Sequence, residues 1–540
     1  MKHLSLRVRS GLPLAALVAS WSFLSFPVEA QDAGGMEKID PPLLEVLHSG
    51  GSARVFLLGR TQLFEPVGSL ERFQREHAGE NRLAQRREVV ATLQGNAEAE
   101  QAAILRALGR ERPDQALWIL NALSLELSAQ EIRAASRLDE VLFIYAGGER
   151  LAPKPRTSTE PILVIPPREP PPFSAEGKRV AWNVQHLDAP RAWRELGSLG
   201  RGAVIAVLDN GANYAHADLR NNLWRNAGEI PNNGVDDDGN GWVDDLYGYD
   251  FGSMSPNVRD TSTSRGRQHG TMTSGMAVGD GSSGIITGVA PRGQLMLLKI
   301  TGGNVDAAGN RPIGAAMAYQ YAIEEGADIL SMSFSLPGLG NLRGFWRMMS
   351  DHAVAAGLLL VGGAGNFRVS QPLPVQHQSP KDVPSVISVG GIDTLGVLRP
   401  FSSMGPAEWS GVALYGDYPL PEGIIKPDVV AFPGEGFPVL GIQDRGYIDT
   451  DSVRIRGNSF SGPQVAGIAA LILAEHPGMS VWRVREIIEQ TAHDLGESGK
   501  DNHFGYGLVD AYAAVVAARA GDPGEPIVPP RRTPSNPRAP

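Results

Sequence analysis

The chain has 540 residues, 42% of them hydrophobic, which allows two or three domains with a sizeable core and excludes disorder as the default interpretation. Its formal net charge of −10, with acids and bases interspersed, argues against a nucleic-acid partner and indicates a soluble acidic protein. The absence of cysteine excludes disulfides, a cysteine nucleophile and cysteine-ligated zinc, so stability must come from the core or from bound metal.

The first thirty residues have the layout of a secretory signal peptide. Lys2, Arg7 and Arg9 precede the apolar stretch "GLPLAALVASWSFLSFP", and "VEA" then supplies small residues before Gln31. A membrane anchor is the alternative, but the run is short and contains serines and prolines, and no later segment approaches ~20 uninterrupted apolar residues. We therefore expect a protein secreted to the periplasm or the extracellular space, without a membrane partner once residues 1–30 are removed.

Residues 31–150 predict a small α+β domain. The segment "ARVFLLG" is typical of a strand, and a charged stretch from about 69 to 110 has helix-compatible spacing. A Ser128 to Glu131 capping box then begins the amphipathic "QEIRAASRL", which "VLFIY" follows as a further strand. Eight prolines in residues 151–176 predict an extended linker and hence a domain boundary.

Residues 177–520 alternate apolar strands with helical patterns. The strand-like runs include "GAVIAVLD", "GQLMLLKIT", "ADILSMSFS", "LLLVGGAGN" and "VISVGG", and the helical ones "IGAAMAYQYAIEEG" and "FWRMMSDHAVAAG". This pattern predicts an α/β fold with a doubly wound, mostly parallel sheet covered on both faces. In such sheets function lies beyond the carboxyl ends of the strands. Residues 521–540 contain seven prolines and predict a disordered tail.

Three short glycine-containing motifs carry chemically active side chains. "VIAVLDNGANYAHADL" puts Asp209 at the end of a buried strand, "QHGTMTSGMAVG" puts His269 before a helix start, and "GNSFSGP" supplies Ser459. Taken singly, each has a structural interpretation: a turn residue, a solvated loop histidine and a helix N-cap. Their occurrence together, in the order Asp, His, Ser, favours a catalytic role.

With these motifs, the region from about 178 to 520 resembles the subtilisin-family serine proteases. The resemblance implies that Ser459 is the nucleophile, His269 the general base, and Asp209 the group that orients the imidazole and stabilises its cation. An α/β-hydrolase does not fit, because it would have serine before histidine and a glycine two residues after the serine, where this chain has Ser461.

The resemblance extends to the substrate site. Asn366, at the end of "LLLVGGAGN", matches the family's oxyanion donor, with the Ser459 backbone N–H as the second donor. "ILSMSFSLPG" resembles the substrate-binding strand, in which Ser333, Phe334 and Ser335 would pair with an extended peptide. The motifs "FSSMGP" at 401 and "KPDVVAFPG" at 426 match as well.

The chain departs from the family pattern at Asn210, Met272, Asn458 and Phe460, and Ser335 stands where a glycine is common. None of these departures removes a catalytic group. Phe460 and Ser335 are expected to border the binding cleft, so the departures bear on substrate preference.

Residues 31–150 resemble the family's inhibitory propeptide, through their overall pattern and "LSLELSAQEIRAASRLDEVLFIY". A structural accessory domain that stays attached is the alternative. Together the resemblances imply a secreted, monomeric serine endopeptidase that acts on polypeptides, is inhibited by its own propeptide and processes itself. Two other functions stay open: a degenerate protease fold serving as a binding module, and a self-processing protein with little activity on other substrates.

The segment "NNGVDDDGNGWVDDLYGYDF", residues 232–251, is rich in oxygen ligands. Its spacing suggests a structural Ca²⁺ held by Asp236, Asp238, Asn240, the Trp242 carbonyl and Asp244. Tyr247 at the twelfth position argues against a true EF-hand, so the oxygen cage would be closed by another group such as Asp245 or Asp250. A tight turn with solvated acids is the alternative. Repulsion among the carboxylates and the family's frequent use of calcium favour the metal site.

Overall fold

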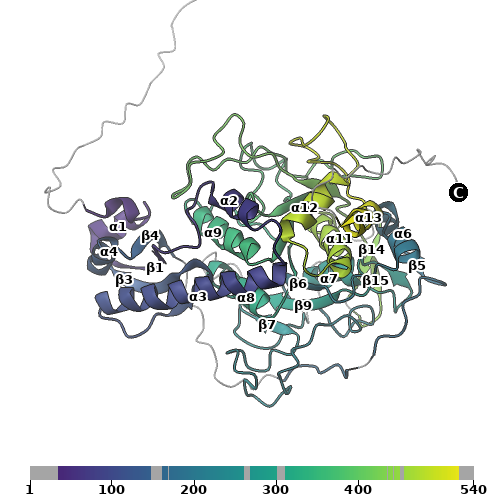
Figure 1. Ribbon diagram of the computed structural model, residues 1–540, viewed down its shortest axis with the longest axis horizontal. Coiled ribbons are helices and arrows are strands. Elements are labelled where there is room, and N and C mark those ends of the chain that lie inside the picture. Colours follow the sequence, from purple (N-terminus) through teal and green to yellow (C-terminus); the bar gives the residue numbers. More distant parts are fainter. Residues whose placement is uncertain are drawn as a thin grey trace, which may run out of the picture.

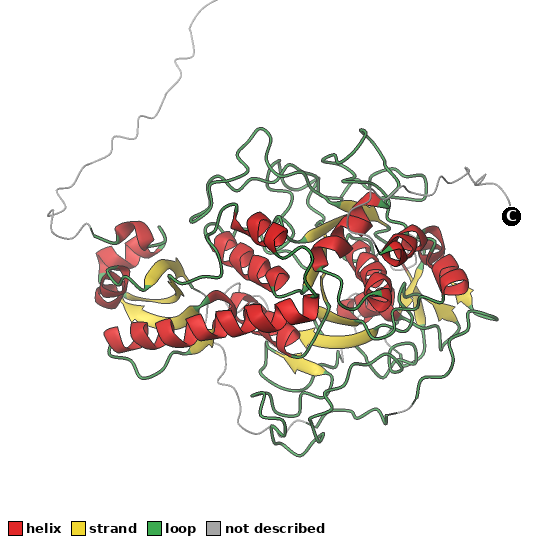
Figure 2. Ribbon diagram, viewed as in Figure 1, coloured by secondary structure: helices red, strands yellow, loops and turns green. Residues whose placement is uncertain are grey.

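The computed structural model describes residues 34–147, 161–167, 169–260, 268–300, 311–434, 436–441, 443–450 and 455–521. The expected signal peptide and almost all of the expected C-terminal tail lie outside these residues, as does the first part of the proline-rich linker. Figure 1 shows a large α/β body with a smaller unit attached through the long helix α3, and Figure 2 separates the helices and strands by colour.

The smaller unit is a four-stranded antiparallel sheet in the order β2-β3-β1-β4. Its strands are β1 (Ser52–Gly59), β2 (Gln115–Leu117), β3 (Ala122–Ser128) and β4 (Val141–Ala146). Its helices are α1 (Leu43–Ser49), α2 (Ser69–Glu76), α3 (Arg82–Ala107) and α4 (Ala129–Ser136), with 3-10 turns η1 (Met36–Lys38) and η2 (Trp118–Leu120). The Ser128–Glu131 capping box that begins α4 is confirmed, and the predicted charged helical stretch forms α2 and α3.

The body is built on a seven-stranded parallel sheet, which confirms the predicted fold class. In sheet order the strands are β13 (Val429–Ala431), β12 (Ile387–Gly391), β11 (Leu359–Gly363), β10 (Ile329–Met332), β6 (Val204–Asp209), β9 (Gln294–Lys299) and β7 (Gly248–Asp250). Every neighbouring pair is parallel, and the central strands are apolar and buried, as expected for a sheet covered on both faces.

The helices cover the sheet in two layers. On one face lies α7 (His269–Val278), which follows β7 and precedes β9 in the chain and contacts β6 and β9. The connections from β9 to β10 and from β10 to β11 run in one direction along the sheet, so right-handed crossovers place α8 (Arg311–Glu324) and α9 (Leu342–Ala355) together on the other face, where they contact each other. Alongside α7 packs the buried helix α11 (Ser461–Glu475), followed by α12 (Val481–Gln490) and α13 (Ala511–Ala520).

Short elements complete the body. They are the strand pairs β5 (Arg179–Val180) with β8 (Ile285–Ile286) and β14 (Pro438–Leu440) with β15 (Tyr447–Asp449), the helices α5 (Trp182–His186) and α6 (Ala189–Arg191), and the π-turn η3 (Ala192–Leu196). The described linker residues 161–167 and 169–175 form no helix or strand. None of the described helices combines the length and the apolar composition needed to span a bilayer.

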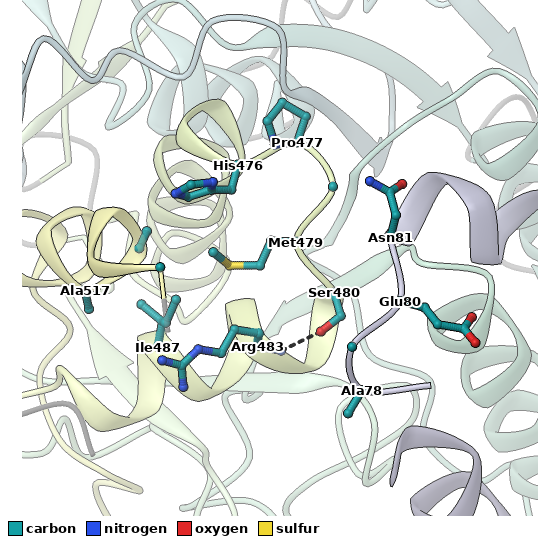
Figure 3. Close-up of a pocket in the computed structure, with 14 residues that line it drawn as sticks. Ala78, Glu80, Asn81, His476, Pro477, Met479, Ser480, Arg483, Ile487 and Ala517 are labelled. Atoms are coloured by element: carbon teal, nitrogen blue, oxygen red, sulfur yellow. Dashed lines mark hydrogen bonds between the residues drawn. The ribbon is translucent and has the colours of Figure 1, made fainter. Parts of the chain in front are cut away.

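The smaller unit packs directly on α8 and α9. Phe56 of β1 packs against Phe345 of α9 with ring centroids 4.8 Å apart, within a hydrophobic core that both units share. The first turn of α3 lies against the loop after α11, because the Arg82 N–H donates to the Gly478 carbonyl at 2.9 Å. A cavity of about 490 Å³ lies beside this contact, and Figure 3 shows Ala78 and Asn81 on one side of it and Met479, Arg483 and Ile487 on the other.

Candidate active site

The predicted catalytic residues lie at the point where the sheet reverses its winding direction. Asp209 is the last residue of β6, and its neighbour Leu208 pairs with Met332 at the end of β10. The chain leaves β6 toward β7 and leaves the adjacent strand β10 toward β11, in opposite directions along the sheet, and such a switch point leaves a crevice beyond the strand ends. Residues 333–335 follow β10 into this crevice, and Ser459 reaches it two residues before α11 begins.

Asp209 and His269 form a close pair. The Nδ1 of His269, the first residue of α7, lies 2.9 and 2.8 Å from the two carboxylate oxygens of Asp209. Burial alone would lower the pKa of His269, but the charge of Asp209 and the hydrogen bond outweigh it, and the pKa is raised above its ordinary value. The side chain of Asp209 is only 8% exposed, whereas that of His269 is 32% exposed. The pair therefore presents an imidazole whose second nitrogen is available to a reacting group.

Ser459 is held against the end of β10. The Ser333 hydroxyl donates to the Ser459 carbonyl at 2.8 Å, and the Ser459 hydroxyl donates to the Ser333 carbonyl at 3.3 Å. Among the described residues, Ser459 makes no hydrogen bond to His269, a contact that is often long until substrate binds. Phe460 is 1% exposed and its ring lies 6.3 Å from that of His269. The expectation that Phe460 borders the cleft is thus wrong: its ring packs beneath the site.

A small cavity of about 170 Å³ opens beside Ser459 and Asn366. It is lined by Ser333, Ser335, Gly363, Gly365, Asn366, Phe367, Lys381 and Ser459. The Asn366 side-chain oxygen accepts from the Asn458 N–H at 2.9 Å, while its Nδ2 donates to no group in the described part of the chain. The Ser459 backbone N–H likewise has no acceptor among the described residues. Two donors near the serine are therefore unoccupied.

Glycine is required at position 363 by this arrangement. A side chain there would collide with the Asn458 carbonyl, next to the Ser459 nitrogen. Asn458, one of the departures from the family pattern, is fully buried and its Nδ2 donates to the Gly365 carbonyl at 2.8 Å. The residue before Ser459 thus fixes the loop that carries Asn366.

The acidic loop predicted to bind calcium leads into β7, the edge strand of the seven-stranded sheet. The structure brings carboxylate oxygens of Glu229, Asp236 and Asp238 within 4.8 Å of one another. Glu229 was missed by the sequence analysis, because it stands seven residues before the acidic run. One oxygen of Asp236 is buried without a hydrogen-bond partner. A buried orphan oxygen among three carboxylates fits a hard cation such as Ca²⁺.

The other predicted ligands make contacts of their own. Asp244 accepts from the backbone N–H groups of Asn233 and Gly234, at 3.1 and 3.0 Å, which closes the loop. The Asn240 amide donates to Asp238 at 3.3 Å, and the Trp242 ring packs on aromatic neighbours of the sheet.

Burial and mutual repulsion raise the pKa values of three acidic side chains around this loop. Burial, with Asp245 and Asp238 nearby, raises the pKa of Glu229 to about 7. Burial also raises the pKa of Asp245 to about 6, and burial with the charge of Asp245 raises that of Glu325 to about 7. A bound cation stabilises the ionised form of carboxylates whose pKa values are raised by burial and by neighbouring negative charges.

The sequence of this chain matches known proteins over the α/β body. The sequence model of the subtilase family matches residues 200–507. Similar proteins include bacillopeptidase F of Bacillus subtilis (29% identical, covering 63% of this chain and 22% of the relative) and the halolysin-like extracellular serine protease Nep of Natrialba magadii (29%, covering 62% and 50%). A third is a calcium-dependent protease of Trichormus variabilis, at 26% identity, covering 63% and 50%. The match thus spans half or less of the length of these relatives.

Proposed function

Because the chain belongs to the subtilase family, we propose that it is a secreted serine endopeptidase that hydrolyses peptide bonds through an acyl-enzyme on Ser459. The observation that carries the proposal is the Asp209–His269 pair at the switch point of the sheet, beside a cavity lined by Ser459 and Asn366. The proposal is supported because these positions suit a nucleophile, a base with its orienting carboxylate, and two hydrogen-bond donors.

In the proposed reaction, the Ser459 hydroxyl attacks the substrate carbonyl as His269 Nε2 takes its proton. Asp209 holds the proton on Nδ1 and stabilises the imidazolium through the contacts at 2.8 and 2.9 Å. The Asn366 Nδ2 and the Ser459 N–H receive the charge that develops on the carbonyl oxygen. His269 then protonates the leaving amine, and a water molecule, activated by the same histidine, releases the acyl group.

The substrate lies extended along residues 333–335 in this proposal. These residues follow β10 without joining a strand themselves, so their backbone is available for pairing with a peptide. Ser335 lines the cavity, and Phe334 is anchored against Trp346 with centroids 6.3 Å apart.

The smaller unit serves as the inhibitory propeptide in this account. Support comes from the end of β4: Ala146 and Gly147 line a cavity together with Leu336 and Pro337, the residues that follow the proposed substrate strand. Ala146 and Gly147 therefore lie next to the proposed substrate strand, as the C-terminal end of an intramolecular inhibitor would. An accessory domain that stays attached would not need to place its last strand beside the substrate site.

Calcium binding is proposed for the acidic loop, with a structural role. Glu229, Asp236 and Asp238 would supply the carboxylate oxygens, and the bound charge would offset their repulsion. This set keeps Asp236 and Asp238 from the sequence-based one and adds Glu229, but it does not include Asn240, the Trp242 carbonyl or Asp244. Asp244 closes the loop through backbone contacts.

The test compares the parent chain with Ser459→Ala by N-terminal sequencing and by turnover of unfolded casein. We expect the parent to lose the first unit and to degrade casein, and the variant to stay full length, apart from the signal, and inactive. A binding module would give two uncut, inactive proteins. Cleavage of the parent without casein turnover would indicate a protein that processes only itself.

A further inference from the structure

A lysine is buried at the inner wall of the cavity beside Ser459. Lys381 is 0% exposed, yet it lines the cavity together with Ser335, Asn366 and Ser459. Its ammonium group donates to the Ser335 hydroxyl at 2.8 Å and lies 5.6 Å from the centre of the Phe334 ring. A lysine is rarely buried unless its charge is paired. Its presence in the cavity wall therefore calls for a counter-charge.

The stem of this lysine runs across β11, where glycine makes room for it. A β-carbon at Gly362 would lie 2.9 and 3.0 Å from the δ- and γ-carbons of Lys381. The side chain is thus fixed along the floor of the cavity, with its ammonium at the end next to Ser335. The ammonium group is therefore held at a fixed position in the cavity, beside the Ser335 hydroxyl.

No carboxylate of the described residues lies within ion-pair distance of the Lys381 ammonium. Its neighbour Asp382 is directed to Arg343, with which it forms an ion pair at 2.8 Å. Burial lowers the pKa of Lys381 to about 7, although the charge of Asp382 acts against this. An anion entering the cavity would reverse the effect of burial and keep the ammonium charged. Because no protein carboxylate pairs with Lys381, a bound ligand would have to supply the negative charge.

The position of the cavity identifies which part of a substrate would enter it. The carbonyl under attack must lie between the Ser459 hydroxyl and the donors on Asn366 and Ser459. The side chain of the same residue, called P1, then extends from that point into the adjoining space. That space is the cavity of about 170 Å³ whose wall contains Lys381 and Ser335. A short side chain with a terminal carboxylate matches both the volume and the charge.

We propose that Lys381 makes the enzyme prefer substrates with an acidic P1 residue, through an ion pair between its ammonium and the P1 carboxylate. The inference rests on the proposed peptidase function and names the substrate class of that site. Ser335 then has a positioning role, since its hydroxyl holds the Lys381 ammonium. This role explains why the chain has a serine at position 335, where the family commonly has a glycine.

The test uses four peptides that differ only at P1, which is Glu, Gln, Leu or Lys, with kcat/KM measured at one fixed pH. Gln has the shape of Glu but no charge. We expect kcat/KM of the parent to be about 10- to 100-fold higher for the Glu peptide than for the Gln peptide, which corresponds to the free energy of a hydrogen bond to a charged group. Equal rates for Glu and Gln, or a preference for Leu or Lys, would overturn the inference. This comparison requires no variant.

Lys381→Met keeps the apolar stem and removes the charge. It should bring the Glu and Gln rates to within about threefold of each other. If Lys381 only supports Ser335, all four peptides would slow equally and the Glu preference would persist, which contradicts the inference. Lys178→Met removes a charge outside the cavity and should keep the parent's ratio. Absence of cleavage of every peptide by the parent would instead reject the peptidase function itself, and the inference with it.

Discussion

Asp209 receives hydrogen bonds from three residues, its neighbour Asn210 and two residues of α7. The Asn210 N–H donates at 2.8 Å, the Thr273 hydroxyl at 3.2 Å, and His269 Nδ1 lies opposite both oxygens. The Asn210 side chain in turn accepts from the Gly270 N–H at 2.8 Å, which ties the aspartate loop to the start of α7. Two donors besides the histidine keep the carboxylate oriented, so the imidazole is held in one tautomer.

The pH dependence of activity follows from this contact. His269 must be neutral to accept the serine proton, and Asp209 raises its pKa. Activity on a neutral peptide should therefore be full above the raised pKa and fall as the pH drops through it, at a midpoint above the ordinary value of about 6.5. Asp209→Asn should lower kcat by about 10³ to 10⁴ and move the midpoint down. A rate that is constant between about pH 5 and 9 would contradict the base assignment.

Asn366 is predicted to act mainly in the transition state. Its Nδ2 is unoccupied in the described part of the structure, where an oxyanion could accept from it, while its side-chain oxygen accepts from the N–H of the buried Asn458. Asn366→Ala should lower kcat by about 10² to 10³ with little change in KM. Parallel thermal unfolding serves as the control, because the side-chain oxygen also accepts from Asn458. Kinetics equal to the parent's would show that another group stabilises the oxyanion.

At the scale of elements, α3 joins the smaller unit to the body through buried arginines. Arg82 forms an ion pair with Asp328 at 2.6 Å, and Arg86 donates to the carbonyls of Ala356 and Gly357 just beyond α9. Cations are favourable at the C-terminal end of a helix. This contact binds the smaller unit to the helix pair that it covers.

Arg82→Ala should destabilise the uncut precursor. Its removal leaves Asp328, 7% exposed, without its cation, a change that costs about 3 kcal/mol. The measurement is denaturant unfolding in the Ser459→Ala background, which prevents processing. Arg87→Ala, an exposed arginine on the same helix, is the matched control. If both variants unfold at the same denaturant concentration, α3 does not hold the units together through this pair.

Elements with strong periodicity were predictable from the sequence. The apolar runs at 202–209, 293–301 and 358–366 became β6, β9 and β11, and the capping box fixed the start of α4. The short strands β7 and β13 were not predicted separately, because three residues carry too little pattern. The order of strands in the sheet depends on crossovers between distant segments, which local patterns do not encode.

Site residues were predictable where a motif marks them. Asp209 and His269, sixty residues apart, were expected to meet, and they do. Lys381 and Glu229 were missed for a physical reason: isolated charged residues are usually solvated, and only the fold shows that Lys381 is buried beside Ser459. The burial of Phe460 was likewise not visible in its motif.

At the scale of the whole molecule, calcium is expected to contribute to stability. A protein without cysteine has no disulfides, and a cation bound only by the folded state stabilises it by about 2.7 kcal/mol at 100 times Kd. EDTA should therefore lower the Tm of the mature protein and added calcium should restore it. Asp238→Ala should remove most of this difference, whereas Asp237→Ala, outside the carboxylate group, should keep it. An EDTA-insensitive Tm would identify the loop as a turn.

The proposed peptidase activity depends on Ser459 being an activated nucleophile. The most direct test is intact-mass and peptide-mapping analysis of the protein after reaction with a fluorophosphonate, which modifies only activated serines. We predict one added phosphonyl group, on Ser459, its attachment slowed in Asp209→Asn and absent in Ser459→Ala. An unmodified parent protein, or modification at another serine, would contradict the account.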